Sequence, residues 1–561
     1  MRNKFRWAGI FLTAGLLAGH IAAEETLEKL TEEKNTRTAE VSIDFSESRC
    51  YSPALFGQNI EYFGIAQGFC RPDNGKVYPY VAEELRKLQI PSVRFPGGTL
   101  SNFYHWRDGI GKQSSRGKGC RTNPKHEAVI PMVFGTDEFF AFLRDTGAEK
   151  AMITVNVPIS PNLEPWMGTA QEAAAWVAYC NAAPDNRTVI GKDANGVDWG
   201  TAGEWAARRV ENGSREPYAV THWELGNEIF TEIKDPKFYA AVCREFSQAM
   251  KAVDPTIRLG VVGKDSDFGK PRSDWNETVL AETRGATDFL IAHFYLPGID
   301  GLNNNGTRTM SAQDVTRITL LSTDRFRRQL GNLRAAIERQ VPGKKDFGIG
   351  ITEFACNLRR DAETDPKRLS LIRSQQAALY VADALLAFLD AGVEVGDYWT
   401  LRGWAWSLLE LSDDRAIPQA AWFAYRLFSA DRQSEYCPAK VRSGEIVLHP
   451  RFGSEFGGAP RPALTTGATV DSERTRGTVL MVNRALDHAT EVTIRLNGLP
   501  HKIGQVKLEV LAAPPETVNT ASSPDALHLT SLPVQFVPGS NVLKCTLPPC
   551  SIGRLMFSTA D

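Results

Sequence analysis

Eight short apolar runs, each followed by a longer segment of helical character, divide the chain between about residue 54 and residue 430. Runs rich in Val, Ile, Phe and Thr that alternate with helical segments are typical of βαβ units and a parallel sheet. Eight such units favour a closed (β/α)₈ TIM barrel over an open, doubly wound sheet. The predicted strands are Leu55–Phe63, Ser92–Phe95, Ala151–Val157, Val220–Leu225, Arg258–Val262, Phe289–Tyr295, Gly348–Phe354 and Gly396–Leu401.

The segments between these runs place apolar residues three and four positions apart, which predicts amphipathic helices. A Pro that follows one of them, Pro255, marks a helix end before the fifth strand. The predicted helices are Val81–Leu88, Asp137–Thr146, Ala170–Cys180, Pro236–Val253, Thr323–Gln340 and Arg368–Ala391.

Short alternating strands between Gly and Pro turns replace this pattern after about residue 430, which predicts a second, all-β sandwich domain over residues 431–561. The barrel is expected over residues 54–430, and 561 residues suffice for both domains. The N-terminal segment 24–53 carries a strand, Val41–Phe45, that is expected to pair into the sandwich. The predicted sandwich strands are Glu445–Leu448, Thr478–Asn483, Thr490–Leu496, Gln505–Leu511 and Gly553–Phe557.

The first 23 residues have the order of a secretory signal peptide: basic residues, a short apolar stretch over 7–18, and small residues at Ala22 and Ala23. A retained membrane anchor is the alternative, but the apolar run is shorter than the ~20 residues of a spanning helix. We therefore expect a secreted or periplasmic protein that leaves the membrane once the signal peptide is cleaved.

The charge balance excludes some partners, because 64 Lys and Arg nearly cancel 66 Asp and Glu. Such a chain has no global basic field for nucleic acid or an anionic membrane, and a small neutral ligand suits it better than a polyanion. Nine cysteines are too few for a disulfide scaffold, and none stands in a CxxC or CxxH spacing. We expect no metal and no cofactor; the oligomeric state stays open, a homo-oligomer included.

Two carboxylic acids, Glu228 and Glu353, come at the ends of the fourth and seventh predicted strands. Loops at the C-terminal ends of barrel strands converge on one axis, so both side chains are expected at the same rim. Glycoside hydrolysis needs such a pair, one acid to protonate the leaving oxygen and one to attack or to activate water. Asn227, directly before the first acid, can bind a sugar hydroxyl. Alone, each acid fits a structural role equally well, so this interpretation depends on the pair.

Other residues at matching strand ends are candidates for the same site. Arg94 in the second strand would help to keep a nearby carboxylate ionised, and Tyr295 in the sixth could donate a hydrogen bond to it. Glu61 ends the first strand and His293 lies two residues before Tyr295. Trp106, in a rim segment, is predicted to stack on a sugar face. The alternatives are buried ion pairs inside the barrel and, for the indole, packing in the core.

At these residues the sequence resembles the clan A glycoside hydrolases, and most closely the α-L-arabinofuranosidases of glycoside hydrolase family 51. The resemblance covers nearly all of the chain after the predicted signal peptide, and its most specific stretch ends at Glu228. The matching motifs are Phe56 to Glu61 (FGQNIE), Val93 to Gly98 (VRFPGG), Trp106 to Gly109 (WRDG), Trp176 to Asn181 (WVAYCN), Glu211 to Gly213 (ENG), Glu216 to Tyr218 (EPY), Trp223 to Glu228 (WELGNE), His293 to Tyr295 (HFY), Thr352 to Phe354 (TEF), Val482 to Arg484 (VNR) and Leu547 to Pro549 (LPP).

The resemblance implies a retaining double displacement with Glu228 as acid/base and Glu353 as nucleophile. The residues that it implies around the cleaved sugar are Glu61, Trp106, Asn227 and Tyr295.

The first hypothesis is thus an enzyme, a retaining glycoside hydrolase that releases non-reducing terminal sugars, with α-L-arabinofuranosyl residues of polysaccharides or oligosaccharides as the leading substrate. Thr99 and the segment 398–406 (YWTLRGWAW) depart from the family pattern where the sugar is expected. A second hypothesis is therefore a clan A glycosidase for a β-xyloside, β-glucoside or β-glucuronide. A third is a carbohydrate-binding protein without catalytic activity.

Overall fold

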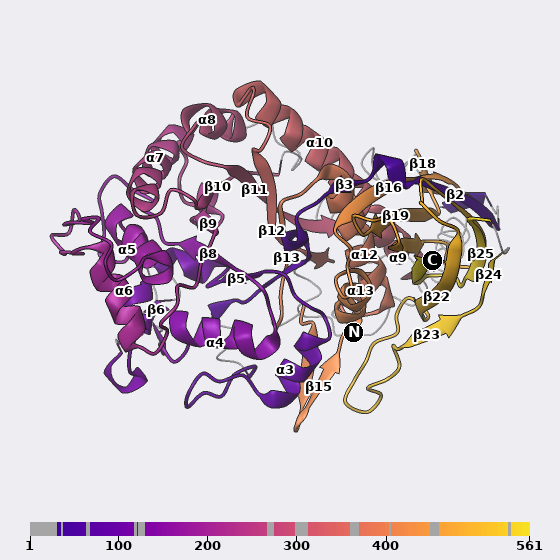
Figure 1. Ribbon diagram of the computed structural model, residues 1–561, viewed down its shortest axis with the longest axis horizontal. Coiled ribbons are helices and arrows are strands. Elements are labelled where there is room, and N and C mark those ends of the chain that lie inside the picture. Colours follow the sequence, from indigo (N-terminus) through magenta and orange to yellow (C-terminus); the bar gives the residue numbers. More distant parts are fainter. Residues whose placement is uncertain are drawn as a thin grey trace, which may run out of the picture.

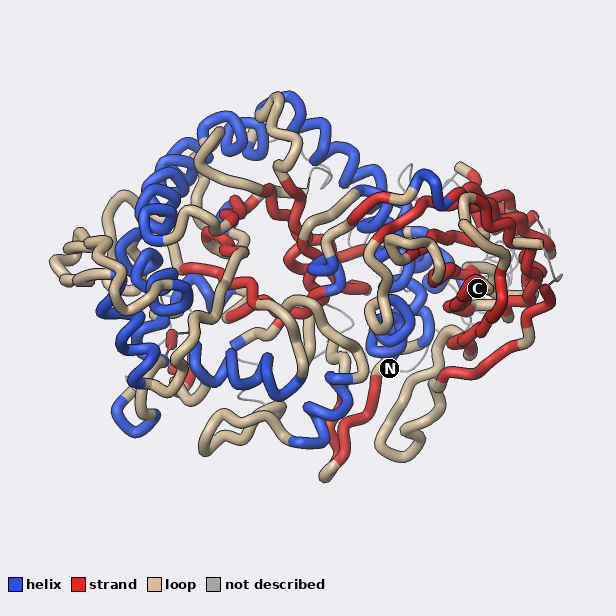
Figure 2. Tube along the Cα trace, in the orientation of Figure 1, coloured by secondary structure: helices blue, strands red, loops and turns tan. Residues whose placement is uncertain are grey.

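The protein folds into a helix-surrounded barrel and a β-rich domain that lies beside it and holds the C-terminus (Figure 1, Figure 2). The computed structural model describes residues 31–34, 37–62, 68–116, 120–121, 129–265, 274–297, 312–358, 370–402, 406–448, 459–536 and 540–560. The predicted signal peptide lies outside these residues. Within them, no helix is long and apolar enough to cross a membrane.

The predicted parallel barrel is confirmed, and all eight of its strands are present. It closes where β13 pairs with β4, with Asp397 opposite Gly57. The first strand is shorter than predicted, because a 3-10 turn, Pro53–Phe56, occupies its start. The barrel strands are β4 (Gly57–Asn59), β5 (Val93–Phe95), β8 (Ala151–Val155), β9 (His222–Leu225), β10 (Arg258–Val262), β11 (Phe289–Pro297), β12 (Gly348–Asn357) and β13 (Val395–Tyr398).

Helices surround the barrel and cover the outward faces of the strands (Figure 1). The last of the predicted helices begins later than expected, at Gln375, and the two residues predicted at its start, 368 and 369, lie outside the described part. Helices α6, α8, α9 and α13 are additional to the prediction. The bounds are α3 (Pro79–Arg86), α4 (Thr136–Thr146), α5 (Ala170–Asn181), α6 (Ala202–Glu211), α7 (Pro236–Val253), α8 (Trp275–Glu282), α9 (Ala312–Leu321), α10 (Thr323–Gln340), α12 (Gln375–Ala391) and α13 (Ala420–Phe428).

The C-terminal domain is one antiparallel-rich sheet folded over its own core. The bend lies in β16, whose first half pairs with β19 and whose second half pairs with β2. Val41 and Ile43 of β2 pack with Leu508 and Val510 from the other arm, so the core forms between the arms. The strands of this sheet are β2 (Thr38–Asp44), β3 (Arg49–Cys50), β16 (Glu435–Arg442), β19 (Leu464–Val470), β20 (Arg476–Asn483), β21 (Thr490–Asn497), β22 (Ile503–Ala512), β23 (Leu529–Leu532), β24 (Val534–Phe536), β25 (Val542–Leu547) and β26 (Ser551–Thr559).

Three small sheets complete the fold, and one of them corrects a prediction. The strand at Glu445–Leu448 (β17) does not enter the large sheet; it pairs with β1 and β18 instead. The hairpin of β14 and β15 follows the last barrel strand. The bounds are β1 (Thr31–Lys34), β17 (Glu445–Leu448), β18 (Pro460–Pro462), β14 (Leu409–Ser412), β15 (Arg415–Pro418), β6 (Cys120–Arg121) and β7 (Val129–Ile130).

A buried ion cluster joins the two domains. Arg484, at the end of β20, donates to Asp383 of α12 (3.2 Å) and to Asp324 of α10 (3.3 Å). Arg327 of α10 donates to the same Asp383 at 3.1 Å. The guanidinium of Arg484 is fully buried and Asp383 is 1% exposed, so each charge depends on the other for its solvation.

Candidate active site

The turn after β9 brings Glu228 to the rim of the barrel. Glu228 itself adopts the left-handed conformation (φ 46°, ψ 32°) and precedes a 3-10 turn, Ile229–Thr231. A non-glycine residue rarely takes this conformation, which costs about 1–3 kcal/mol and is found most often at functional sites. The backbone of the neighbouring Asn227 is held by the Asn102 side chain, which donates to its carbonyl (2.8 Å) and accepts from its N–H (2.9 Å).

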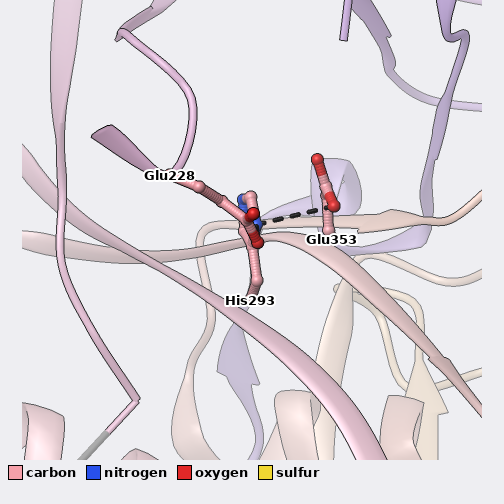
Figure 3. A group of neighbouring side chains, drawn as sticks. All are labelled: Glu228, His293 and Glu353. Carbon is pink, nitrogen blue, oxygen red and sulfur yellow. Dashed lines mark hydrogen bonds and ion pairs between the residues drawn. The ribbon is translucent and has the colours of Figure 1, made fainter. Parts of the chain in front are cut away.

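Glu228 and Glu353 face one another across the end of the barrel, with His293 beside both (Figure 3). A carboxylate oxygen of each lies within 4.8 Å of the other. His293 Nδ1 is 2.9 Å from Glu228 Oε1 and 3.5 Å from Glu353 Oε2. The barrel register explains this arrangement, because His293 on β11 stands directly opposite Glu353 on β12.

Arg94 occupies the centre of the barrel beneath this pair. Its guanidinium donates to Glu353 Oε1 at 3.0 Å, to Asn227 Oδ1 at 2.7 Å and to Glu224 Oε2 at 2.5 Å. It also donates to Asn59 Oδ1 at 3.0 Å. Burial would lower the pKa of Arg94, but the negative charges of Glu224 and Glu353 outweigh it and hold the pKa above its ordinary value. One fully buried cation on β5 thus fixes residues from three other barrel strands, which are β4, β9 with the turn after it, and β12.

The Glu353 carboxylate is buried and held on both oxygens. Arg94 donates to Oε1, and the Tyr295 hydroxyl donates to Oε2 at 2.6 Å. Burial raises the pKa of Glu353, while the charges of His293 and Arg94 and the Tyr295 hydroxyl stabilise its ionised form. Its side chain is 6% exposed, against 36% for Glu228. Glu353 is therefore the fixed carboxylate of the pair and Glu228 the one that reaches solvent.

A chain of hydrogen bonds supports His293 from below. Thr352 donates its hydroxyl proton to Glu224 Oε1 at 3.0 Å, and its oxygen lies 3.0 Å from His293 Nε2. A hydroxyl has one proton, and an ionised carboxylate can only accept. Thr352 therefore accepts from His293, which places a proton on Nε2 and turns Nδ1 toward Glu228.

The 2.9 Å contact between His293 Nδ1 and Glu228 Oε1 is a path along which one proton can pass between the two side chains. Burial would lower the pKa of His293, but the charges of Glu353 and Glu228 and the hydrogen bond to Glu228 raise it above the ordinary value. Burial would raise the pKa of Glu228, but the hydrogen bond and charge of His293, with Arg94, lower it. Proton transfer along the 2.9 Å contact converts imidazolium and carboxylate into imidazole and carboxylic acid.

Glu61 forms a side of the site with Gly98 and Trp399. A Cβ placed on Gly98 would lie 2.6 Å from the Trp399 ring and 3.0 Å from Glu61 Oε1, so only glycine fits between them. The backbone of Gly98 has φ +59°, a further reason for glycine. Burial, with the charge of Glu353, raises the pKa of Glu61 to about 7. Glu61 is thus electrostatically coupled to Glu353.

Trp106 is not where the sequence analysis places it. Its ring is stacked on Trp176 (centroids 5.8 Å apart) and meets Trp205 edge-on, and it is 1% exposed. Its indole N–H donates to the Glu172 carbonyl at 3.0 Å. A ring covered in this way has no face left for a sugar, so the prediction that Trp106 stacks on substrate is wrong and core packing is the role that it has. Trp399 adjoins Gly98 together with Glu61, and Trp406 packs against Tyr295 with ring centroids 6.0 Å apart, so both of these aromatic residues lie next to predicted site residues.

Sequence reasoning missed the inner layer of the site: Glu224, Thr352, Thr154 and Asn59. Glu224 carried a signal, since an acid within an otherwise apolar barrel strand must find a buried partner. Thr352 carried none, because consecutive residues of a regular strand face opposite sides. The pairing of β12 with β11 and with β13 is irregular at this point, so the side chains of the consecutive residues Thr352 and Glu353 both contact residues inside the barrel.

Asp397, on β13, is a further buried acid of the barrel. It is fully buried, and neither carboxyl oxygen has a hydrogen-bond partner among the described residues. Burial raises its pKa well above the ordinary value. Gly57 makes room for it, because a Cβ there would lie 2.1 Å from Asp397 Oδ1.

Glu228, His293 and Glu353 together have donor atoms close enough to hold a metal ion. Both oxygens of Glu353 already accept hydrogen bonds from Arg94 and Tyr295, and His293 Nδ1 lies against Glu228. These contacts satisfy the three side chains without an ion. That the reaction needs no metal or cofactor stays a prediction.

Two family models match the chain in succession. The α-L-arabinofuranosidase 1 domain matches residues 84–297, and the α-L-arabinofuranosidase C-terminal domain matches residues 404–551. The exo-α-(1→6)-L-arabinofuranosidase of Bifidobacterium longum is 26% identical over 79% of this chain and 82% of its own length. The α-L-arabinofuranosidase C of Emericella nidulans is 31% identical over 36% of this chain, and that match spans only 34% of its length.

Solved structures share the fold. A family 51 α-L-arabinofuranosidase from Bifidobacterium longum has a TM-score of 0.75 at 21% identity and covers 94% of this chain and 100% of its own. The family 51 arabinofuranosidase from Xanthomonas axonopodis pv. citri has a TM-score of 0.72 at 21% identity, over 94% and 100% of the two chains. With the two family models, the closed barrel and the C-terminal β domain, these comparisons show that the chain is a glycoside hydrolase, most similar to the α-L-arabinofuranosidases of family 51.

Proposed function

We propose that this glycoside hydrolase is a retaining, exo-acting α-L-arabinofuranosidase in which Glu353 is the nucleophile and Glu228 the acid/base. The observation that carries the retaining mechanism is the separation of the two carboxylates, with an oxygen of each within 4.8 Å of the other. Retaining enzymes hold their carboxyl groups about 5–5.5 Å apart, whereas inverting enzymes need about 6.5–9.5 Å to admit a water. A separation this short favours the retaining mechanism for the proposed pair.

The roles follow from how each carboxylate is held. A nucleophile must be fixed beneath the sugar, and Glu353 is buried with Arg94 on one oxygen and Tyr295 on the other. An acid/base must reach both the leaving group and the incoming water, and Glu228 is the more exposed of the two. The two carboxylates therefore differ as double displacement requires, with one fixed as the nucleophile and the other exposed as the acid/base.

In the first step Glu353 attacks the anomeric carbon while the glycosidic bond breaks. The leaving oxygen takes the proton from Glu228, and the sugar becomes an ester of Glu353. In the second step Glu228 takes a proton from water, whose oxygen attacks the anomeric carbon and releases Glu353. His293 supports both steps, because its Nδ1 can give Glu228 a proton or take one back along their 2.9 Å contact.

Arabinofuranose as the sugar is supported by the two matching family models and by the names of the relatives, two of which are exo-α-L-arabinofuranosidases from Bifidobacterium longum. The Glu61 carboxyl and the Trp399 ring both adjoin Gly98, and we infer that they contact sugar hydroxyls and an apolar sugar face respectively. Asn227 contributes through its amide N–H₂, since its oxygen accepts from Arg94.

Turnover of a panel of nitrophenyl glycosides tests the substrate. We expect release of nitrophenol from the α-L-arabinofuranoside. A preference for the β-xyloside, β-glucoside or β-glucuronide would identify that sugar as the substrate instead of arabinofuranose. No turnover of any glycoside would favour a carbohydrate-binding protein without catalytic activity. Glu353→Ala should abolish turnover. Glu228→Ala should slow poor leaving groups by about 10²–10⁴-fold and activated ones far less, since only the former need the proton. Equal losses on both leaving groups would contradict the assigned roles.

We also propose that the protein is exported, on the strength of its first 23 residues. Some relatives are named intracellular enzymes, among them one from Bifidobacterium longum, so export would distinguish this chain from them. Cell fractionation with N-terminal sequencing of the recovered protein tests this. A mature chain that begins near Glu24 outside the cytoplasm is expected, and an uncleaved chain in the cytoplasm would contradict it.

A further inference from the structure

A pocket of about 420 Å³ lies where the C-terminal domain meets the barrel. Two of its walls come from connections that follow barrel strands: Ser370 and Arg373 lie between β12 and α12, and the β14–β15 hairpin lies between β13 and α13. Connections after barrel strands belong to the face of the barrel that holds Glu228 and Glu353. The third wall, Val518–Ala521, comes from the long connection between β22 and β23 of the other domain. Two of the three walls of the pocket therefore belong to the catalytic face of the barrel.

The third wall is fixed in place by the barrel. The first N–H groups of α12, of Gln375 and Gln376, have no partner within the helix and donate to the carbonyls of Thr517 and Pro515 (2.9 and 3.1 Å). The Asn519 amide donates to the Pro418 carbonyl of β15 at 3.0 Å. Figure 1 shows the hairpin and this connection descending side by side from the body of the molecule. The pocket is thus a preformed junction of both domains.

The lining suits a neutral, hydroxyl-rich ligand. Arg373 and Glu410 form an ion pair at the pocket, so their charges cancel. Leu411, Ile417 and Val518 supply an apolar surface. A small-molecule site characteristically joins a mostly apolar wall to a few fixed polar groups, in a volume of about 300–1,000 Å³.

Gln419 adds an unsatisfied acceptor. It lines the pocket and is 1% exposed, yet its Oε1 has no hydrogen-bond partner among the described residues. Its amide nitrogen is held by the carbonyls of Ile417 and Asn519, both at 3.3 Å. An amide oxygen buried without a partner is costly, and a ligand hydroxyl is a donor that would satisfy it.

From these observations we propose that the junction pocket is a second saccharide-binding site, which takes an uncharged sugar unit of the polysaccharide or oligosaccharide whose terminal sugar is being cleaved. The proposal rests on the proposed function for the nature of the ligand. It assigns the C-terminal domain a part in substrate recognition, because without residues 518–521 the pocket has no third wall.

Binding of xylotetraose to the full-length protein, measured by saturation-transfer NMR and calorimetry, tests the site. This uncharged oligosaccharide carries no arabinofuranosyl group, so the proposed enzyme does not consume it. Ala521 is exposed at the pocket, and Ala521→Trp should block it. Ala526 is exposed on the same connection but does not line the pocket, so Ala526→Trp is the matched control. Linear arabino-oligosaccharides serve as a second probe in the Glu353→Ala variant, which cannot cleave them.

We expect Ala521→Trp to weaken binding about tenfold or more and Ala526→Trp to leave it unchanged. With a branched arabinosylated oligosaccharide as substrate, Ala521→Trp should raise KM while kcat/KM for nitrophenyl arabinofuranoside stays constant. Binding that survives Ala521→Trp, or no binding of either probe at millimolar concentration, would overturn the proposal. Failure of the proposed function would show separately, as an absence of nitrophenyl arabinofuranoside turnover in the unmodified protein.

Discussion

Replacing Thr352 by Val cuts the hydrogen-bond chain between Glu224 and His293 and touches neither carboxylate of the proposed reaction. Thr352 is fully buried, and its oxygen is the acceptor that holds the proton on His293 Nε2. With Val at this position, the doubly protonated imidazolium has a buried N–H without a partner. The neutral imidazole can carry its single proton on Nδ1 instead, where Glu228 accepts the hydrogen bond. The substitution therefore destabilises the imidazolium form of His293 and not the neutral form.

The magnitude follows from that difference. A buried donor left without a partner costs about 1–3 kcal/mol, and 1.36 kcal/mol corresponds to one pKa unit. Thr352→Val should therefore lower the pKa of His293 by about 1–2 units from its raised value in the native protein. Because the Glu228–His293 pair must carry one proton to act as the general acid, activity is lost as the pH rises through this pKa. The alkaline limb should move to lower pH by the same amount.

The assay is the pH dependence of kcat/KM for a phenyl arabinofuranoside, whose poor leaving group needs the proton. Thr154→Val is the matched control, because Thr154 also donates to Glu224 (2.6 Å, at Oε2) and is fully buried. Its hydrogen bond lies on the other oxygen of Glu224, away from His293, so its alkaline limb should stay where it is. An alkaline limb that does not move in Thr352→Val, or that moves equally in both variants, would refute the shared-proton account.

Three further outcomes are expected. Asp383→Asn should lower the free energy of unfolding in urea at pH 7 by about 3–5 kcal/mol, because the buried Arg484 loses a charged partner. The fold lowers the pKa of Asp383, so its carboxylate stabilises the protein above the ordinary pKa of 3.8, and this stabilisation is lost as the pH falls further. The unfolding free energies of the native protein and the variant should therefore converge at low pH. Trp106→Leu should lower the midpoint of urea unfolding and leave KM for an aryl arabinofuranoside unchanged. A raised KM with unchanged stability would instead show that Trp106 contacts the sugar. Glu61→Gln should remove a change in KM between about pH 6 and pH 8, because the carboxyl with a pKa of about 7 is then absent; persistence of that change would assign it to another group.

The residues of the barrel strands, and their order, could be read from the chain because buried parallel strands are short, apolar and spaced by amphipathic helices. The same reasoning located Glu228 and Glu353, since strand ends of a closed barrel share one rim. The ends of strands were less predictable: β4 is only Gly57–Asn59, because local turns near Pro53 replace extended backbone.

What the local pattern could not supply was which side chains meet. Trp106 is an aromatic residue in a predicted rim segment, as a sugar-stacking residue would be. Only the tertiary structure shows that it packs against Trp176 and Trp205 and not in the site. Thr352 enters the proton chain through an irregular register between strands distant in sequence, which periodicity does not report.

The amino-acid sequence by itself determined the fold class and placed the two proposed catalytic acids at one rim, because apolar periodicity and strand-end acids are local properties of the chain. The similarity to the family 51 enzymes rests instead on the resemblance of its motifs. Only the tertiary structure decided the hydrogen-bond chain from Glu224 through Thr352 and His293 to Glu228, and the pocket shared by the two domains. Both depend on distances of a few ångströms between segments far apart in the chain, and such distances are set by register and packing.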